Sequence, residues 1–183
     1  MRLFVAVFPP LEVREALADA ARKLPVAGKV RFTAPANIHL TLKFLGDVRE
    51  EGLDRVAEAL EPVRRRHEPF EAEISGFGAF PSKGRARILW AGIGEGSEAL
   101  ISLSRDVEES LEPLGFEREN RPYVPHLTLG RARGRPATLE DADISPQVPG
   151  FTVDRVELVR SVLDKDGATY STLAAYPLSE GRD

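Results

Sequence analysis

The string HLTL occurs twice in this chain, beginning at His39 and again at His126. The chain has three histidines, so two of the three open these strings. In a β-strand, successive side chains point to opposite faces, and each histidine then shares a face with the threonine two residues later, Thr41 or Thr128. The leucines would face the other way and anchor each strand in a core. The repeat therefore predicts two matching His-Thr pairs that face a common site.

Two histidines with a hydroxyl group beside each are suited to acid and base chemistry on a phosphate. Because the ordinary pKa of histidine is about 6.5, one ring can accept a proton from an attacking oxygen while the other donates one to a leaving oxygen. Each such transfer accelerates a reaction by roughly 100- to 10,000-fold. The threonine hydroxyls can donate hydrogen bonds to the oxyanion that develops. The pattern predicts a displacement at a phosphodiester that needs no metal.

Other uses of these residues have less support in the sequence. A catalytic zinc site uses three protein ligands, and the third histidine, His67, follows three arginines in what we expect to be the solvated end of a helix. A Ser-His-Asp triad has no GxSxG string to support it and would leave the second HLTL unexplained. The string GIGEGS at 92–97 lacks the full spacing of a dinucleotide-binding loop and indicates a strand-to-helix turn. We expect no metal and no cofactor.

The composition is that of a globular protein. Of 183 residues, 42% are apolar and 30% are charged, and no apolar run approaches the roughly 18 residues that a membrane span needs. The absence of cysteine excludes disulfides, thiolate zinc sites and cysteine nucleophiles. The opening string MRLFVAVFPP has too short an apolar stretch for a signal peptide and is expected to form a first strand. We expect a cytoplasmic monomer with no membrane partner.

The charge pattern limits how the chain could bind nucleic acid. A formal net charge of −4 argues against a protein that binds long nucleic acid through its overall charge. Two local basic clusters remain, KGRAR at 83–87 and GRARGR at 130–135, and the second follows directly on the second HLTL. Arginine far outnumbers lysine and there is a single methionine, which favours a thermophilic source, although a GC-rich genome would give the same arginine bias.

Apolar periodicity and turn residues divide the chain into strands and helices in two similar halves. The expected strands are 3–8, 38–46, 70–79, 85–93, 126–132, 151–163 and 170–178, and the expected helices are 11–24, 49–66 and 97–114, with Ser97 as N-cap and Gly115 as C-cap. A Pro-rich connection is expected at 134–150. We predict an α+β fold in which a two-lobed duplicated module has antiparallel sheets lining a central pseudo-twofold cleft, with helices packed outside. Residues 1–183 are expected to form this one domain.

The chain resembles the two-histidine phosphoesterases, and within them the RNA 2′,3′-cyclic phosphodiesterases, also called 2′-5′ RNA ligases. Besides the two HxTx motifs, the resemblance rests on the strings LFVAVFPP, NIHLTLKFLGDV, GFGAFPSKGRARILWAGI, RPYVPHLTLGR and LVRSVLDKDGATYSTLAAYPL, which cover most of the chain. It implies hydrolysis of a 2′,3′-cyclic phosphate at an RNA 3′ end to a 2′-phosphate, without ATP or metal, and a related 2′-5′ ligation. The implied partners are RNA 3′ ends or small cyclic nucleotides. The alternative is a module that binds RNA ends without turnover.

The resemblance also implies roles for individual residues. His39 and His126 correspond to the catalytic histidines, with His39 as the acid and His126 as the base, and Thr41 and Thr128 correspond to the threonines that bind the substrate. Arg131 corresponds to the phosphate-binding arginine after the second motif. An arginine at this distance from His126 can also reach phosphate oxygens through a two-pronged contact.

The positions after the first motif differ from those after the second. Lys43 and Phe44 stand where an arginine would be needed, so we expect the two lobes to hold the substrate asymmetrically, and Lys43 to face solvent or the edge of the core. Aromatic side chains near the cleft could stack on an RNA base. The candidates are Phe8, Phe32, Tyr123 and Tyr170.

Overall fold

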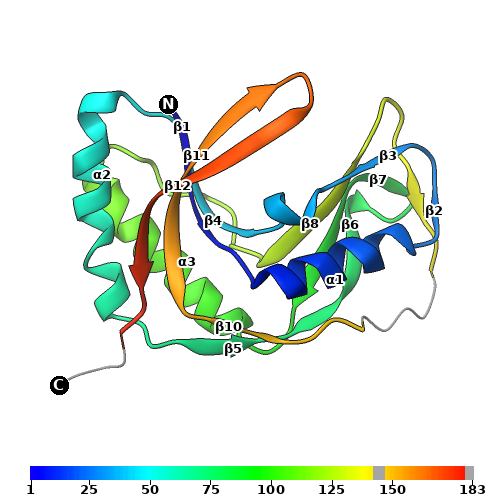
Figure 1. Ribbon diagram of the computed structural model, residues 1–183, viewed down its shortest axis with the longest axis horizontal. Helices are drawn as coiled ribbons and strands as arrows, with labels where there is room; N and C mark the ends of the chain where they lie inside the picture. Colours follow the sequence, from blue (N-terminus) through cyan, green and yellow to red (C-terminus); the bar gives the residue numbers. More distant parts are fainter. Residues whose placement is uncertain (142–146, 180–183) are drawn as a thin grey trace.

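A computed structural model describes residues 1–141 and 147–179 of the chain (Figure 1). Within these residues the α-helices are α1 (Leu11–Arg22), α2 (Leu53–Leu60) and α3 (Ser97–Leu111). The strands are β1 (Arg2–Val7), β2 (Val26–Ala27), β3 (Val30–Phe32), β4 (Leu40–Asp47), β5 (Phe70–Ala72), β6 (Ile74–Ser82), β7 (Arg85–Ile93), β8 (His126–Ala132), β9 (Thr138–Leu139), β10 (Phe151–Val153), β11 (Arg155–Asp164) and β12 (Gly167–Pro177). Short 3₁₀ turns lie at Pro35–Asn37, Glu50–Gly52, Val63–Arg65 and Glu112–Leu114. None of the helices in the described ranges is long and apolar enough to cross a membrane.

One antiparallel sheet runs through both halves of the chain. In the described residues it has eight strands in the order β12-β11-β1-β4-β8-β7-β6, with β3 pairing on β8. The strands that carry the two HLTL strings, β4 and β8, are neighbours at its centre. Two small two-stranded sheets, β10-β5 and β2-β9, lie outside it. The predicted α+β fold with antiparallel strands is confirmed, and the strands of the two halves join at β4 and β8.

The order of the strands has the approximate symmetry of a duplicated module. β1 flanks β4 on one side of the centre as β7 flanks β8 on the other. α1 lies between β1 and β4 in the chain, and α3 lies between β7 and β8. Each half therefore supplies a strand, a helix and an HLTL strand in the same order.

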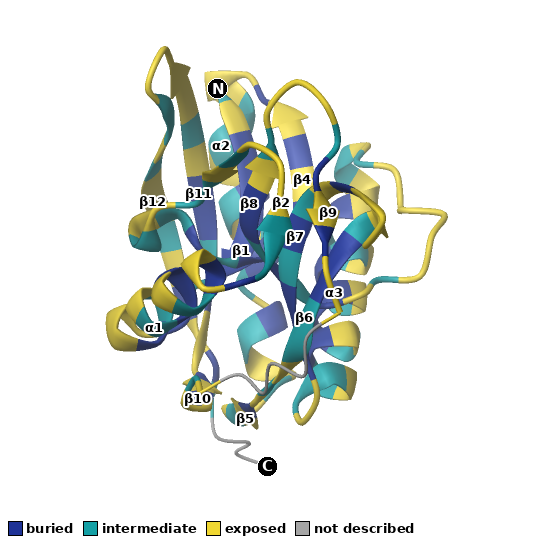
Figure 2. Cartoon of the chain, turned by 90° about the vertical axis from the view of Figure 1, so that its right-hand side faces the viewer, coloured by how far each residue is buried: buried dark blue, intermediate teal, exposed yellow. Residues whose placement is uncertain are grey.

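The helices and the leucines of the HLTL strings bury one another on one face of the sheet. Leu40, Leu42, Leu127 and Leu129 belong to the main hydrophobic cluster, together with the inner faces of the three helices. Figure 2 shows the buried positions concentrated in the central strands and along the inner sides of the helices. Full burial of one leucine side chain contributes about 1.5–3 kcal/mol. These leucines therefore fix which face of each strand is left for the histidines and threonines.

Each connecting helix packs beneath the HLTL strand of the other half. α1, which follows β1, contacts β8, whereas α3, which follows β7, contacts β4. The second contact includes a hydrogen bond from the Ser104 hydroxyl to the Leu42 carbonyl at 3.1 Å. Figure 1 shows α3 to the lower left and α1 to the lower right, both below the raised β11–β12 hairpin. The two halves are thus interlocked.

The prediction of one long helix at 49–66 is wrong at both ends, because the α-helix is shorter. Only α2 is α-helical, and 3₁₀ turns at Glu50–Gly52 and Val63–Arg65 flank it. Gly52 precedes α2 and Pro62 follows it, and neither residue favours the interior of an α-helix. Ser97 was expected to cap α3 but is its first helical residue, and Gly96 caps it instead with a φ of 83°. A side chain there would place Cβ 2.4 Å from the Glu71 carbonyl oxygen, so only glycine fits.

Several short strands have no signal in the sequence. β2, β3 and β9 are two or three residues long and form through pairing with distant segments, which leaves no local periodicity to detect. β9 lies in the expected connection at 134–150, of which residues 142–146 are outside the described ranges. The expected strands at 70–79 and 151–163 are each divided in two, into β5 and β6 and into β10 and β11. Gly115 ends the helical segment as expected, with a φ of 91°.

Candidate active site

The two HLTL strings meet at the centre of the sheet. β4 and β8 pair in antiparallel orientation with Leu40 opposite Leu127. In this antiparallel register Thr41 lies across from His126, and His39 lies across from Thr128. Each histidine therefore faces the threonine of the other string. The four partly buried side chains on the face opposite to the leucines are His39, Thr41, His126 and Thr128. The sequence prediction of two His-Thr pairs facing a common site matches this arrangement.

A β-bulge follows the threonine of each string, at the second leucine. The pairing of β4 with β1 skips Leu42, and the pairing of β8 with β7 skips Leu129. A bulge of one residue reverses which face the following side chains take. The second residue beyond each bulge, Phe44 in β4 and Arg131 in β8, therefore returns to the face of the histidines. These two residues occupy equivalent places in the two halves.

Lys43 lies on the core side of the bulge, away from the histidines. Its ammonium group is 2.6 Å from a carboxylate oxygen of Glu108 on α3 and donates a second hydrogen bond to the Glu117 carbonyl at 2.7 Å. Its exposed fraction is 4%, whereas that of Phe44 is 66%. The two halves thus differ at this place, because an exposed phenyl ring stands where the other half has a guanidinium group.

Both histidines are oriented by the same backbone contact. Nδ1 of His39 donates a hydrogen bond to the Asn37 carbonyl, and Nδ1 of His126 donates one to the Val124 carbonyl, each at 2.8 Å. A carbonyl oxygen can only accept, so Nδ1 carries the hydrogen and the lone pair of the neutral ring is on Nε2. Nε2 is therefore the nitrogen of each ring that is available for proton transfer.

The Nε2 atoms differ in their surroundings. Nε2 of His39 accepts a hydrogen bond from the hydroxyl of Thr41 at 2.9 Å, whereas Nε2 of His126 has no hydrogen-bond partner in the described part of the chain. Burial lowers the pKa of His39 to about 4, the hydrogen bond to Asn37 acts in the opposite direction, and the positive charges of His126 and Arg131 lower it further. In the free protein His39 is therefore neutral near pH 7.

Arg131 presents an uncompensated positive charge to the site. It is exposed, and no ion pair with a carboxylate is found for it in the ranges that the structure describes. Its charge acts on Tyr170 as well as on His39. The site thus combines two imidazole rings, two hydroxyl groups and one free guanidinium group on one face of the sheet, which suits a phosphate anion.

Aromatic rings enclose both histidines. The ring centre of His39 is 4.9 Å from that of Phe4, 5.3 Å from that of Phe8 and 5.2 Å from that of Tyr170. The ring of Phe80 meets His126 edge to face at 5.2 Å, and Trp90 lies 5.3 Å behind Phe80. The three rings around His39 exclude water from its imidazole, which is the physical cause of its low pKa.

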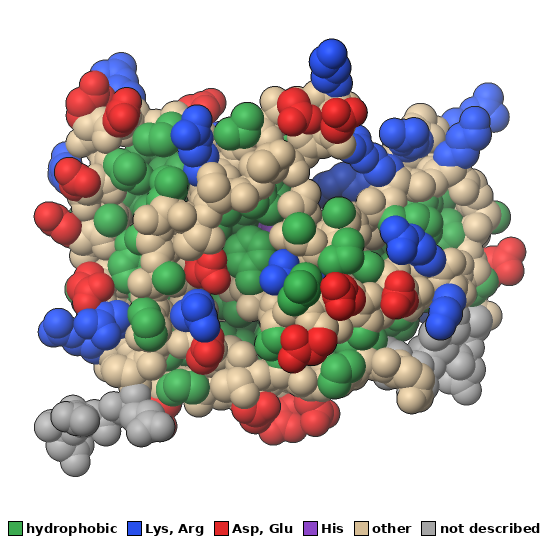
Figure 3. Space-filling view, viewed as in Figure 1, with side chains coloured by type: hydrophobic (Ala, Val, Ile, Leu, Met, Phe, Trp, Pro, Cys, Tyr) green, Lys and Arg blue, Asp and Glu red, His purple; other side chains and the backbone are tan. Residues whose placement is uncertain are grey.

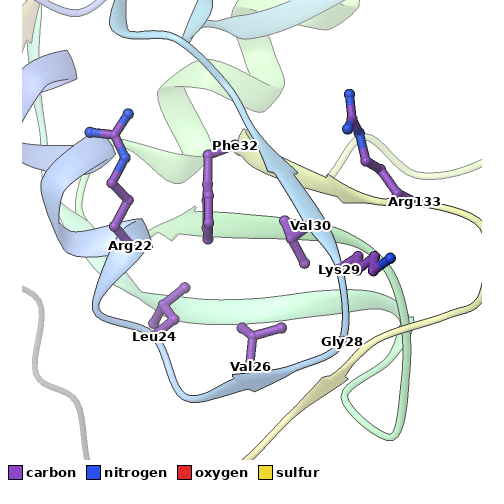
Figure 4. Close-up of a pocket in the computed structure, with 8 residues that line it drawn as sticks. All are labelled: Arg22, Leu24, Val26, Gly28, Lys29, Val30, Phe32 and Arg133. Carbon is purple, nitrogen blue, oxygen red and sulfur yellow. The ribbon is translucent and has the colours of Figure 1, made fainter.

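Two of the four expected stacking residues lie at the site. Phe8 and Tyr170 contact His39, but Tyr123 packs against the main core. Phe32 lines a cavity on the core side of β3, where its ring is seen beside Leu24 and Val30 (Figure 4). The reason is strand register, since Phe32 pairs with Gly130, which points away from the histidines. Sequence reasoning missed the rings of Phe4, Phe80 and Trp90.

His67 is not in the solvated position expected for it. Its Nε2 is 2.7 Å from a carboxylate oxygen of Asp106 on α3, and its side chain is 11% exposed. The expectation was wrong because the 3₁₀ turn ends at Arg65 and the chain then turns back against α3. Among residues 1–141 and 147–179, no group of three or more His, Cys, Asp or Glu side chains is placed to hold a metal ion.

Comparison with known proteins identifies the family. A sequence profile of the 2′-5′ RNA ligase superfamily matches residues 9–165. The chain belongs to this superfamily. A curated superfamily relative, the RNA 2′,3′-cyclic phosphodiesterase of Archaeoglobus fulgidus, is 36% identical over 181 residues, which are 96% of this chain and 99% of the relative. The protein of the same name from Methanothermobacter thermautotrophicus is 33% identical over 184 residues, 95% of this chain and 99% of the relative.

Two solved structures of similar proteins share the fold. A protein from Thermus thermophilus superposes with a TM-score of 0.80 at 32% identity, over 97% of this chain and 98% of that one. E. coli LigT in complex with 3′-AMP superposes with a TM-score of 0.78 at 27% identity, over 98% and 99% of the two chains. The family inferred from the sequence is therefore confirmed. Several matching relatives come from thermophiles, in keeping with the arginine-rich composition.

Proposed function

We propose that this protein hydrolyses the 2′,3′-cyclic phosphate at an RNA 3′ end to a 2′-phosphate, in the cytoplasm and without a metal ion. The observation that carries the proposal is the arrangement about Leu40 and Leu127, which brings two HxTx motifs to one face, with Nδ1 of each ring held by a backbone carbonyl and Nε2 left for proton transfer. The names of the curated relatives support the substrate, and the binding of 3′-AMP by LigT supports a nucleotide end as ligand. Residues 1–183 act as one two-lobed domain, because each half supplies one motif.

The reaction follows from two Nε2 atoms on opposite sides of phosphorus. Water attacks phosphorus and gives its proton to Nε2 of His126 as the new P–O bond forms. The bond between phosphorus and O3′ breaks, and O3′ takes a proton from Nε2 of His39. The product carries a 2′-phosphate and a free 3′ hydroxyl, and exchange with solvent restores both rings. An RNA 5′ hydroxyl in place of water would give a 2′-5′ linkage by the same displacement, without ATP.

The remaining groups bind the charge of the phosphoryl oxygens. Thr41 and Thr128 donate hydrogen bonds to the oxygens that do not leave, and Arg131 pairs with them through two N–H groups. His39 must carry a proton to serve as the acid, although it is neutral in the free protein at pH 7. A phosphate anion among His39, His126 and Arg131 offsets the two charges that lower this pKa. Substrate binding is thus coupled to protonation of His39.

The test is turnover by the purified full chain in excess chelator. The substrate is a short oligoribonucleotide with a 2′,3′-cyclic phosphate end, and the product is identified by mass and by phosphorus NMR. We expect a 2′-phosphate product at the same rate with and without chelator, and loss of activity in His39→Ala and in His126→Ala. Binding of the oligonucleotide without turnover would instead identify a module that only binds RNA ends. Activity that disappears with chelator and returns with added metal would refute the metal-free mechanism.

A further inference from the structure

Two arginines lie directly opposite each other beside the candidate active site. β3 pairs with β8 so that Arg31 is across from Arg131, and directly opposed residues share a face of the sheet. Like charges in this position destabilise a strand pair unless an anion lies between them. The guanidinium group of Arg31 donates to the Asp166 carbonyl at the turn of the β11–β12 hairpin, and the described residues include no carboxylate that pairs with it. Further N–H groups of Arg31 remain for a ligand.

The row of cations continues along the same two strands. The amide of Arg133 donates to the Lys29 carbonyl at 2.8 Å, so this pair extends the pairing of β3 with β8. Arg133 is two residues beyond Arg131 and therefore takes the same face. Figure 4 shows the side chain of Arg133 extending away from Val30 and Phe32, which point into the cavity on the core side. We call Lys29, Arg31, Arg131 and Arg133 the cationic ladder.

The strand segments that carry and flank the ladder contain no Asp or Glu. The segments 25–33, 74–93 and 120–139, which include β3, β6, β7 and β8, have nine Lys or Arg residues and no Asp or Glu, although the whole chain has a net charge of −4. Figure 3 shows Lys and Arg side chains gathered along the upper right of the molecule, over the lobe that carries β2 and β3. The positive charge is therefore concentrated on the lobe into which β8 leads from the site.

A cavity lies on the core side of β3, next to the outer end of the ladder. Its volume is about 510 Å³, its lining includes the cations Arg22, Lys29 and Arg133, and no carboxylate is among the residues that line it. Its floor is apolar, with Leu24, Val26, Val30 and Phe32 (Figure 4). A cationic rim over an apolar floor suits a ligand that has phosphate groups and flat rings.

We propose that the cationic ladder binds the RNA strand that precedes the reacting 3′ end. This inference rests on the proposed function, because it takes the cyclic phosphate to lie between the histidines with Arg131. The strand then leaves the site along β8, and its upstream phosphates meet Arg31, Arg133 and Lys29 in turn. Two residues of a β-strand span about 6.8 Å, which is close to the separation of successive phosphates in an extended single strand. The ladder makes the protein selective for RNA chains over free cyclic nucleotides.

The experiment compares two substrates that share the same reacting end. One is a 2′,3′-cyclic mononucleotide, and the other is an oligoribonucleotide that ends in the same nucleotide. In Lys29→Ala/Arg133→Ala, kcat/KM for the oligonucleotide should fall at least about tenfold, and each lost phosphate contact should reduce the slope of log affinity against log salt by about 0.7. The mononucleotide has no phosphate at these positions, so its kcat/KM should change by less than about threefold.

The matched control is Arg65→Ala/Arg105→Ala, which removes two exposed arginines from the other lobe and should leave both substrates unaffected. Equal effects of the ladder variant on the two substrates, or no effect on either, would refute the ladder. Binding of an oligonucleotide with a 2′-phosphate end, followed by fluorescence anisotropy, separates this inference from the proposed function. If the wild type turns over neither substrate, the proposed function fails. The ladder is then supported if Lys29→Ala/Arg133→Ala weakens binding of this oligonucleotide, and refuted if it does not.

Discussion

Leu40 and Leu127 lie opposite each other on adjacent antiparallel strands, and each has an exposed fraction of 0%. This pair is the centre about which the two HLTL strings are related. One buried contact therefore sets the distance and the mutual orientation of the two histidines, and the chemistry of the site depends on it.

The low pKa of His39 can be measured directly. In the free protein we expect the ring signals of His39 to titrate with a pKa of about 4, and to move toward the ordinary value of about 6.5 when phosphate is added. Because phosphate favours the protonated ring, its affinity should rise as the pH falls from 6.5 toward 4. Proton NMR of the three histidines, assigned with His39→Ala and His126→Ala, gives the values. A phosphate-independent pKa for His39 would show that the anion binds elsewhere.

The two histidines should respond differently to an easier leaving group. A general acid is dispensable when the leaving oxygen is already a weak base. We expect His39→Ala to be nearly inactive on an RNA 2′,3′-cyclic phosphate but partly restored on an analogue with an activated 3′ leaving group, whereas His126→Ala stays inactive on both. Single-turnover rates on the two substrates measure this. Restoration of His126→Ala in place of His39→Ala would mean that the acid and base roles are exchanged.

Arg131 should not tolerate lysine. Arg131→Lys keeps the charge but loses the planar pair of N–H donors, and hydrogen bonds to charged groups are worth about 1.5–3 kcal/mol. We expect kcat/KM to fall by roughly 10- to 100-fold with an unchanged unfolding midpoint. Steady-state kinetics on the cyclic mononucleotide, with Arg65→Lys as the matched control, tests it. Wild-type kinetics in Arg131→Lys would remove this residue from the site.

Lys43 should be important for stability and not for chemistry. Removal of one partner of a buried ion pair costs about 3–5 kcal/mol, because the other charge is left without compensation. We expect Lys43→Met to lower the free energy of unfolding by this amount, because the Glu108 carboxylate loses its partner, and to leave kcat of the folded fraction unchanged. Urea unfolding measures the change. In Lys43→Met/Glu108→Leu most of the loss should be recovered; a double variant as unstable as the single one would contradict this explanation.

The sequence identified the core of the site because HLTL is both a chemical motif and a strand pattern. Alternation alone correctly separates the histidines and threonines from the buried leucines. The same alternation would place Lys43 with the histidines and Arg131 with the leucines, and the bulges at Leu42 and Leu129 reverse both positions. A bulge is a property of two paired strands, so one strand's sequence does not reveal it. Arg131 was inferred from family resemblance and from its distance to His126.

The parts that could not be predicted depend on pairing between distant segments. Phe80 reaches His126 only because β6, β7 and β8 align in a particular register. Trp90 can lie where it does because residue 78 is glycine, at which a Cβ would be 2.2 Å from the indole ring. Arg31 stands beside Arg131 through the three-residue strand β3. Neither local propensity nor periodicity contains this information.

The packing of α1 under β8 and of α3 under β4 has a consequence for how such a protein can be divided or built. In a fragment containing one half alone, the helix would lack the strand on which it packs. The HLTL strand would lack the helix that covers its leucines. Two copies of one such fragment, however, could exchange helices and satisfy both needs, as in a domain-swapped dimer. The single chain has the geometry of that exchanged dimer with its two subunits joined end to end. Its site is formed where the two halves meet, and neither half alone contains it.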